Sequence, residues 1–578
     1  MVIKYSDEKN VLILIALLKA HGIKKVVASP GATNVTLVTS MRRDPWFEMY
    51  SSVDERSAAY IACGLAAETG EPVIISCTGA TASRNYIPGL TEAFYRKLPV
   101  LAITSTQILA RVGQHIAQVI DRSSMQKDIV KLSLTLPIIK DNEDIWECEL
   151  KVNRAILELS RQGGGPVHLN LPTTYNMSFS VTELPTVRKI ERITNSYSLP
   201  KLSGRVAVFI GSHSNFKKEE ERILDAFCAS NDAVVLCDHT SGYKGKYRVL
   251  SSLPGCQHGF DTSLAPDIVI SIGEISGDYY NMAIKSKQIW RVSDDGELRD
   301  TYKKLRYVFE MPEQQFFEYY TNSVEIPKDQ YLKNCKAKIN ELSGKIPELP
   351  FSNIWLASKM AHRIPDGSTI HFGILNSLRS WNFFELPPSV QSASNVGGFG
   401  IDGGLSSLIG ASFANRDKLY FCVIGDLAFF YDMNVLGNRH VGDNLRILLV
   451  NNGKGTEFRQ YKHHASSLGD EADEFVAAAG HFGNKSKQLT KHYAEDLGFD
   501  YLFAENKEGF DEMVDKFLVN KVTEKPILFE VFTNSELEAE ALKAMMNIEI
   551  DVKEKTKETM KQFVGDSTLK GIKKIFGR

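Results

Sequence analysis

Two polar clusters in the C-terminal half of the chain combine the residue types of a metal and phosphate site. Gly425-Asp426 belongs to the first cluster, and Asn451-Asn452 follows after 24 residues (427–450). Carboxylate, amide and backbone carbonyl oxygens are hard ligands suited to Mg²⁺ beside a diphosphate. The stretch that begins at Leu427 is expected to start a helix, whose free N–H groups can receive a phosphate. An Asp cap and an Asn turn without a ligand are the plain structural alternative.

Both clusters follow short apolar runs that have the length of buried strands. Residues 420–424 precede Asp426, and residues 447–450 precede the Asn pair. In open α/β sheets, ligands bind at the carboxyl ends of neighbouring parallel strands. We therefore expect the two clusters to lie together at one edge of a sheet. Along the rest of the chain, apolar runs of this kind alternate with helical stretches, which indicates parallel βαβ units.

This alternation predicts an α/β fold with three Rossmann-like domains. A helix over 9–20 opens the first domain, and polar stretches at 178–203 and 326–350 are expected to be linkers. The expected domains and tail are 1–180, 190–330, 350–535 and 536–578. The end of the tail, from about 552, is basic. It is expected to be solvated, to lie on a partner or membrane surface, or to cover the active site.

The composition excludes several classes of protein. The chain has 578 residues, of which 43% are hydrophobic and 24% charged, so it is not disordered, collagen-like or stapled by disulfides. A formal net charge of −2 provides no global field for nucleic acid. The eight cysteines form no C-x-x-C pair and are typical of reduced thiols in a cytoplasmic protein. The apolar run at 11–18 is far shorter than the roughly 20 residues of a membrane span.

Further candidate residues lie in the N-terminal segment. Together with the two polar clusters, they form a pattern that is similar to that of a known family. Pro30-Gly31 follows a short strand, Glu55 opens a helical stretch, and Thr78 enters a Gly turn that leads to Asn85. With the Gly-Asp…Asn-Asn spacing, these segments resemble thiamine diphosphate (ThDP)-dependent 2-oxo acid decarboxylases and carboligases. Within that family, residues 395–403 and 425–434 are similar to SEPHCHC synthase of menaquinone synthesis. The resemblance covers roughly residues 8–535.

The resemblance implies pyrimidine-binding, middle and diphosphate-binding domains, and a role for each candidate residue. Glu55 would bind the aminopyrimidine ring, unless it is only a first-turn helix residue. Gln114 or Gln118 would lie near the thiazolium, unless both are surface residues. Ile401 would hold the cofactor bent, unless it is an ordinary core residue, and the Phe399 carbonyl would bind the cofactor's amino group. The implied cofactor-binding residues are Pro30, Gly31, Glu55, Thr78, Asn85, Asn376, Ser377, Phe399, Ile401, Asp426, Leu427, Ala428, Asn452 and Lys454, and the implied metal ligands are Asp426, Asn452 and Lys454.

The chain departs from SEPHCHC synthase where that enzyme has cations around its anionic substrates. In this chain, the positions of its arginines and of its Lys-Arg pair are occupied by Thr33, Gln107, Trp381, Val396 and Asp278-Tyr279. A buried carboxylate without its cation costs several kcal/mol. Trp381 and Val396 would offer a carboxylate only desolvation, so we expect a less anionic donor and a neutral or polyhydroxylated acceptor. The remaining cationic candidates, which are substrate contacts or structural groups, are Arg379, Arg459, His463 and His464.

These observations predict a cytoplasmic, Mg²⁺- and ThDP-dependent enzyme. It would decarboxylate a 2-oxo acid, with a pyruvate-like donor favoured, and ligate the resulting enamine to an acceptor. The alternatives are a simple decarboxylase, SEPHCHC synthase proper and a ThDP-binding homologue without activity. The resemblance also implies a homodimer or homotetramer in which Glu55 and Asp426 meet across a subunit interface. The middle domain lacks a G-x-G-x-x-G motif, so FAD is not expected.

Overall fold

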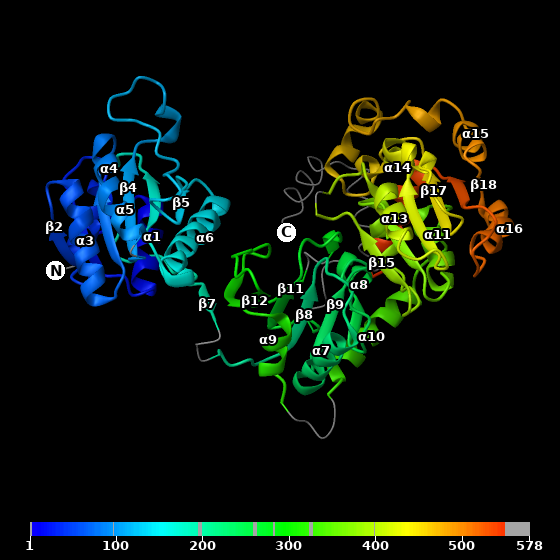
Figure 1. Cartoon of the computed structure of the whole chain (residues 1–578), viewed down its shortest axis with the longest axis horizontal. Helices are drawn as coiled ribbons and strands as arrows, with labels where there is room; N and C mark the ends of the chain where they lie inside the picture. Colours follow the sequence, from blue (N-terminus) through cyan, green and yellow to red (C-terminus); the bar gives the residue numbers. More distant parts are fainter. Residues whose placement is uncertain are drawn as a thin grey trace, which may run out of the picture. The chain divides into compact units, whose positions relative to one another are not determined.

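A computed structural model describes residues 3–95, 97–194, 199–257, 263–280, 284–322, 328–397 and 399–549. The chain folds into two compact units. Unit 1 comprises Met1–Leu199 and Asp294–Met311, and unit 2 comprises Pro200–Ser293 and Pro312–Arg578. Figure 1 labels many of the elements of both units.

Unit 1 is built around a six-stranded parallel sheet with the order β2-β1-β3-β4-β6-β5. Its strands are β1 (Lys25–Ala28), β2 (Glu48–Ser51), β3 (Val73–Cys77), β4 (Val100–Thr106), β5 (Leu132–Thr135) and β6 (Val167–Pro172). Its helices are α1 (Lys9–Ala20), α2 (Val35–Arg43), α3 (Glu55–Thr69), α4 (Thr81–Asn85), α5 (Ile87–Tyr95) and α6 (Asn142–Glu158). Two more strands of this unit, β7 (Glu191–Ile193) and β13 (Leu305–Glu310), pair in parallel.

Successive side chains of the central strands pack into two different layers. Val26 of β1 joins the core formed with α1 and α6, whereas Val27 joins the core formed with α3 and α5. A strand that is buried on both faces needs apolar residues at every position, which explains its continuous apolar run. The helices therefore cover both faces of the sheet and leave the strand ends for polar loops.

Unit 2 contains two further groups of parallel strands. The first has the order β10-β9-β8-β11-β12, with strands β8 (Val206–Ile210), β9 (Val234–Cys237), β10 (Arg248–Leu250), β11 (Ile268–Ile272) and β12 (Gln288–Ser293). The second is a six-stranded sheet with the order β15-β14-β16-β17-β19-β18. Its strands are β14 (Thr369–Phe372), β15 (Gln391–Ser394), β16 (Tyr420–Gly425), β17 (Leu445–Asn451), β18 (Asp500–Ala504) and β19 (Ile527–Phe532).

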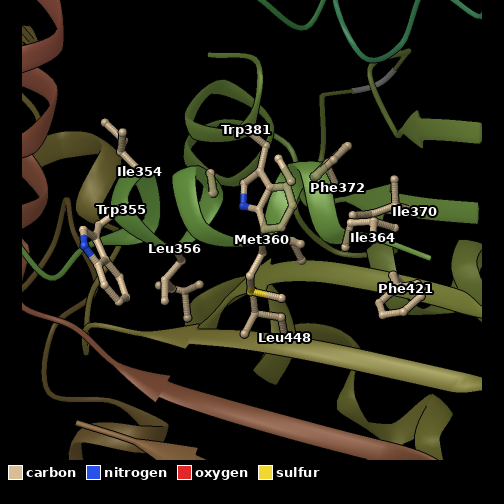
Figure 2. Close-up of a cluster of buried hydrophobic side chains, with 14 of the residues drawn as sticks. Ile354, Trp355, Leu356, Met360, Ile364, Ile370, Phe372, Trp381, Phe421 and Leu448 are labelled. Atoms are coloured by element: carbon tan, nitrogen blue, oxygen red, sulfur yellow. The ribbon is translucent and has the colours of Figure 1, made fainter. Parts of the chain in front are cut away.

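Helices of unit 2 form separate cores on the two faces of the six-stranded sheet. The helices of the unit are α7 (Lys218–Asn231), α8 (Ser252–Cys256), α9 (Glu313–Tyr319), α10 (Gln330–Ser343), α11 (Asn353–Met360), α12 (Asn376–Trp381), α13 (Gly404–Ser412), α14 (Asp426–Asp432), α15 (Leu489–Asp496), α16 (Lys507–Phe517) and α17 (Ser535–Met546). Figure 2 shows one of these cores, in which Trp381 of α12 lies above Met360 and beside Phe372. The core fixes α12, which begins at the carboxyl end of β14.

The layered parallel architecture confirms the predicted α/β fold class, while the domain boundaries stay a prediction. The predicted helix at 9–20 is present as α1. The stretch 326–350, expected to be a linker, instead contains α10, because Tyr331, Leu332, Cys335 and Leu342 form an apolar stripe within a lysine-rich segment. The basic segment from 552 lies outside the described residues. The start of the expected tail forms α17, whose Met545 is buried.

Two further observations concern the cysteines and the hydropathy of the helices. All eight cysteines are described and buried, and they form no disulfide with one another. Among the described residues, no helix combines the length and the apolar character that crossing a bilayer requires.

Candidate active site

A cavity of unit 2 lies at the carboxyl ends of β14, β16 and β17. Residues that the sequence proposed for cofactor binding line it, namely Asn376, Ser377, Ile401, Asp426, Leu427, Ala428, Asn452 and Lys454. They come from four segments that are distant in sequence. Parallel pairing of β16 with β14 and β17 brings the three strand ends together, as expected for a ligand site in an open sheet.

Asp426 is a buried carboxylate of this cavity. It is the first residue of α14, and only 6% of its surface is exposed. Burial raises the pKa of Asp426 to about 7, although the backbone N–H groups of Leu427 and Gly453 oppose the shift. A carboxylate buried in this way is suited to a cation as its partner, because a positive charge offsets the cost of desolvation.

The neighbouring oxygen atoms complete a donor set that fits Mg²⁺. The side-chain oxygen of Asn452 is held by the Thr456 hydroxyl, which donates to it at 2.6 Å. The side chain of Lys454 bonds to Asp473 at 2.6 Å, so a role at the metal would fall to its carbonyl. Among the described residues, no group of three or more His, Cys, Asp and Glu side chains could hold a metal ion. The expected set contains one carboxylate, one amide and one carbonyl, which is a hard-oxygen site that keeps room for phosphate oxygens.

Several non-glycine residues in the proposed cofactor segments have a left-handed backbone. Leu375, which precedes α12 and lines the cavity, has a φ of 68°, and Phe399 has a φ of 55°. In unit 1, Ala80 and Gln118 have φ values of 57° and 63°. Such residues are uncommon, cost about 1–3 kcal/mol each and concentrate at functional sites. The positive φ sets the direction of the Phe399 carbonyl, which is the group proposed to bind the cofactor.

Glu55 and Asn85 form the polar centre of the candidate site in unit 1. Glu55 opens α3 and Asn85 ends α4, and the Asn85 amide donates to the Glu55 carboxylate at 3.2 Å. The Pro30-Gly31 turn packs against Thr78. A Cβ atom added to Gly31 would lie 2.1 Å from the Thr78 Cβ, so only glycine fits there.

The structure separates the two glutamine candidates. Both side chains are exposed, but the Gln118 backbone carbonyl approaches Gly79, where an added Cβ would lie 2.9 Å from it. Gln118 therefore lies beside the Thr78-Gly79 turn. The backbone N–H of Gln114 instead bonds to the Arg111 carbonyl at 3.2 Å, within its own loop. This placement favours Gln118 for the proposed role.

Comparison with known proteins shows the family. A family model described as "Thiamine pyrophosphate enzyme, N-terminal TPP binding domain" matches residues 11–125. A relative from Bacteroides thetaiotaomicron, named 2-succinyl-5-enolpyruvyl-6-hydroxy-3-cyclohexene-1-carboxylate (SEPHCHC) synthase, is 33% identical over 568 residues, covering 93% of this chain and 98% of the relative. A relative of the same name from Bacteroides fragilis is also 33% identical, with the same coverage. A third, from Flavobacterium johnsoniae, is 27% identical over 90% of this chain and 95% of the relative.

The chain belongs to the SEPHCHC synthase family of ThDP-dependent enzymes. An enzyme of the lyase or transferase type follows from this membership. Two of the residues that stand where SEPHCHC synthase has cations do not face the cavity. Trp381, labelled in Figure 2, is fully buried and Val396 is 3% exposed, and both belong to the same hydrophobic core. This corrects the expectation that these side chains would meet a substrate carboxylate, because α12 turns Trp381 into the core.

The other residues that stand where SEPHCHC synthase has cations also make local contacts. The Thr33 hydroxyl donates to the Ser105 carbonyl at 2.8 Å, and the Gln107 side chain accepts from Arg111. Asp278 is buried, accepts from Ser252 and from the Tyr280 N–H, and has its pKa raised to about 6 by burial. None of these groups supplies a cation to a substrate.

Among the remaining basic candidates of unit 2, Arg379, Arg459 and His463 are partnered by acidic groups or by the backbone, and the His464 ring contacts the His463 ring. Arg379 bonds to Glu457. Arg459 contacts Asp473 at 3.0 Å and Asp470 at 3.1 Å. The His463 Nδ1 accepts from the Ala465 N–H at 3.1 Å. Lys454 is the single Lys or Arg among the described residues that line the cavity, and its ammonium group is paired with Asp473.

Sequence reasoning missed two carboxylates that line the cavity. Glu457 follows the Asn pair by five residues, and Glu538 comes from α17. Glu538 is 2% exposed, accepts from the Asn353 N–H at 3.0 Å and from the Thr533 hydroxyl at 2.7 Å, and has its pKa raised to about 7 by burial. A lone Glu in a loop or on a helix carries no periodic signal, so only the folded chain shows that it reaches the cavity.

Proposed function

We propose that the chain is a Mg²⁺- and ThDP-dependent enzyme that decarboxylates a 2-oxo acid and ligates the remaining unit to an acceptor. The observation that supports this most is the convergence of Asn376, Asp426 and Asn452 at the carboxyl ends of three adjacent strands. When bound, ThDP supplies the electron sink for the loss of CO₂. The chain's own residues bind it, orient it and manage protons.

Each group has a proposed role that fits its surroundings. Asp426, Asn452 and the Lys454 carbonyl would hold Mg²⁺, which would supply positive charge beside the diphosphate. Asn376, Ser377 and the backbone of Leu427 and Ala428 at the start of α14 would bind diphosphate oxygens, and Ile401 would support the cofactor. Pro30, Gly31, Thr78 and Asn85 form the pyrimidine site, in which Glu55 holds a proton at a ring nitrogen. Gln118 orients the substrate near the reacting carbon, and the Phe399 carbonyl accepts from the amino group.

We propose a pyruvate-like donor because of the charges around the cavity. Three carboxylates line it, from Asp426, Glu457 and Glu538, whereas the single lining ammonium group among the described residues is already paired. Mg²⁺ would offset Asp426, and Arg379 already pairs with Glu457, so neither leaves a cation for a second substrate carboxylate. A donor with a second carboxylate would therefore lose hydration without gaining a cation, which disfavours it.

SEPHCHC synthase activity itself is the second candidate. The names of relatives that are 33% identical over 93% of the chain favour it. A plain decarboxylase and an inactive ThDP-binding homologue are further outcomes that the same assay separates. We propose a cytoplasmic location, which the eight buried cysteines without a disulfide support.

Turnover of a panel of 2-oxo acids tests the proposal. The protein, reconstituted with Mg²⁺ and ThDP, is given pyruvate, 2-oxobutyrate and 2-oxoglutarate, each with and without aldehyde acceptors, and CO₂ and products are measured. Release of CO₂ with a ligated product supports the proposal, whereas CO₂ with only the free aldehyde indicates a decarboxylase. Binding of ThDP without any turnover indicates the inactive homologue.

We also propose that the active species is a homodimer or homotetramer in which Glu55 and Asp426 of one site come from different subunits. The proposal rests on the family's mode of cofactor binding. Mixing inactive Glu55→Gln and Asp426→Ala proteins, followed by subunit exchange, should restore about a quarter of the activity if exchange is random. Recovery of no activity, in a mixture shown by mass spectrometry to contain hybrid oligomers, would contradict it.

A further inference from the structure

The Glu457 carboxylate is placed at the cavity by two partners. Glu457 lies in the 3₁₀ turn η6 (Thr456–Arg459) and 12% of its side chain is exposed. Nη1 of Arg379 donates to its Oε1. With its amide nitrogen directed at Glu457, Asn376 donates to Oε2 at 2.7 Å and accepts from the Glu457 N–H at 2.8 Å. The carboxylate thus joins the start of α12 to the segment after β17.

The guanidinium of Arg379 is itself held in place by the aromatic ring of Tyr279. The guanidinium lies 3.6 Å from the centre of the Tyr279 ring, a distance typical of a tight cation–π stack. The side chain is 11% exposed, and Nε and Nη2 are buried without a partner among the described residues. Gly277 allows this approach, because a Cβ there would lie 2.3 Å from Leu378 of α12. The guanidinium therefore contacts Glu457 and Tyr279, and Arg379 is not among the described residues that line the cavity.

This arrangement leaves Glu457, and not Arg379, among the residues that line the cavity. The two other lining carboxylates have local partners. Asp426 accepts from the Gly453 N–H at 2.9 Å, and Glu538 accepts from the first N–H of α11. Like charges that approach within a few Å in a partly buried site repel much more strongly than in water. Arg379 offsets the charge of Glu457, but the cavity meets the carboxylate end of this pair and not the guanidinium. A negative group beside Glu457 is therefore disfavoured, whereas a hydroxyl or methyl group is not.

We infer that Glu457, oriented by Arg379 and Asn376, is the residue that selects against donors with a second carboxylate. This inference rests on the proposed function and assigns its donor preference to one pair of side chains. The cavity then admits short 2-oxo acids with neutral side chains. Arg379 acts through Glu457 and is a positioning residue, whose loss would leave the carboxylate without its counter-charge.

Opposite effects of the two single variants distinguish this role from a purely structural one. Glu457→Gln removes the negative charge and should raise the ratio of kcat/KM for 2-oxoglutarate over pyruvate by about tenfold or more. Arg379→Gln leaves Glu457 uncompensated and should lower the same ratio. In the double variant both charges are absent, so the ratio should lie between those of the two single variants and above the wild-type value, because Glu457 and not Arg379 lines the cavity. Loss of packing alone would move both single variants in the same direction and overturn the inference.

An equilibrium measurement accompanies the kinetics. Calorimetric titration with methyl acetylphosphonate and with succinylphosphonate, analogues of the two donors that cannot lose CO₂, should show the same shift in relative affinity for Glu457→Gln. The matched control is Glu512→Gln, an exposed carboxylate on α16, which should leave both ratios unchanged. An unchanged ratio in Glu457→Gln, with an active wild-type enzyme, overturns the inference alone. A wild-type enzyme that binds neither analogue and turns over no 2-oxo acid overturns the proposed function and the inference with it.

Discussion

The backbone N–H of Gly453 donates to the Asp426 carboxylate at 2.9 Å, which ties the loop after β17 to the end of β16. The bond orients one carboxylate oxygen within a cavity that Asn452 also lines. Burial raises the pKa of Asp426 to about 7, so the site is suited to a bound cation. This relationship underlies the proposed cofactor site.

Asp426→Ala should abolish Mg²⁺-dependent ThDP binding, because the diphosphate would lose the cation that bridges it to the protein. Calorimetric titration of ThDP in the presence and absence of Mg²⁺ measures this directly. Asp417→Ala, which removes an exposed carboxylate before β16, is the matched control and should bind as the wild type does. ThDP affinity that is unchanged in Asp426→Ala would show that the metal site lies elsewhere.

Glu55→Gln should keep the fold and ThDP binding but slow cofactor activation by about two to four orders of magnitude, the usual range for a lost acid–base group. The Asn85 amide holds the carboxylate at 3.2 Å, and Gln preserves its shape without its proton affinity. Exchange of the thiazolium C2 proton for deuterium, followed by NMR, is the measurement. Asp54→Asn tests the neighbouring exposed carboxylate and should exchange normally. Wild-type exchange in Glu55→Gln would remove Glu55 from this role.

Glu538→Gln should change the pH dependence of stability. Burial raises the pKa of Glu538 from its ordinary value of 4.5 to about 7, so the folded state holds this proton more tightly than the unfolded state. The stability that this provides is fully present below pH 4.5 and is lost as the pH rises through 7. Gln has no such loss, and the Tm of the variant relative to wild type should rise between about pH 5 and pH 8. Glu536→Gln, on the exposed side of α17, should give a flat difference, and a flat difference for Glu538→Gln would contradict the account.

Trp381→Arg should destabilise the protein and not improve the use of 2-oxoglutarate. Trp381 is fully buried, and its Nε1 donates to the Asn353 side chain at 3.2 Å. Trp381→Ala should cost about 3–5 kcal/mol of the free energy of unfolding, and Trp381→Phe should cost less. Denaturant unfolding measures these losses. A stable Trp381→Arg protein with enhanced 2-oxoglutarate turnover would mean that the side chain faces the substrate.

Local sequence patterns predicted the fold class and the meeting of Asp426 with Asn452 at one sheet edge because those patterns are strong. Buried parallel strands such as β16 and β17 need continuous apolar runs, and the polar residues that follow them mark the ligand edge of the sheet. The side-chain directions on α12 were not predictable in this way. Whether Trp381 or Arg379 points to the core depends on the packing of the whole helix against β14. The contact of Glu457 with Arg379 likewise depends on the crossing of segments 78 residues apart.

Competition between donors tests the central claim most directly. The Mg²⁺- and ThDP-loaded enzyme is given equal concentrations of pyruvate and 2-oxoglutarate, with isochorismate and an aldehyde as acceptors, and products are followed by mass spectrometry. The account predicts CO₂ from pyruvate, a ligated product that carries its two-carbon unit, and no SEPHCHC. Efficient consumption of 2-oxoglutarate together with isochorismate would contradict it and assign the chain to SEPHCHC synthesis.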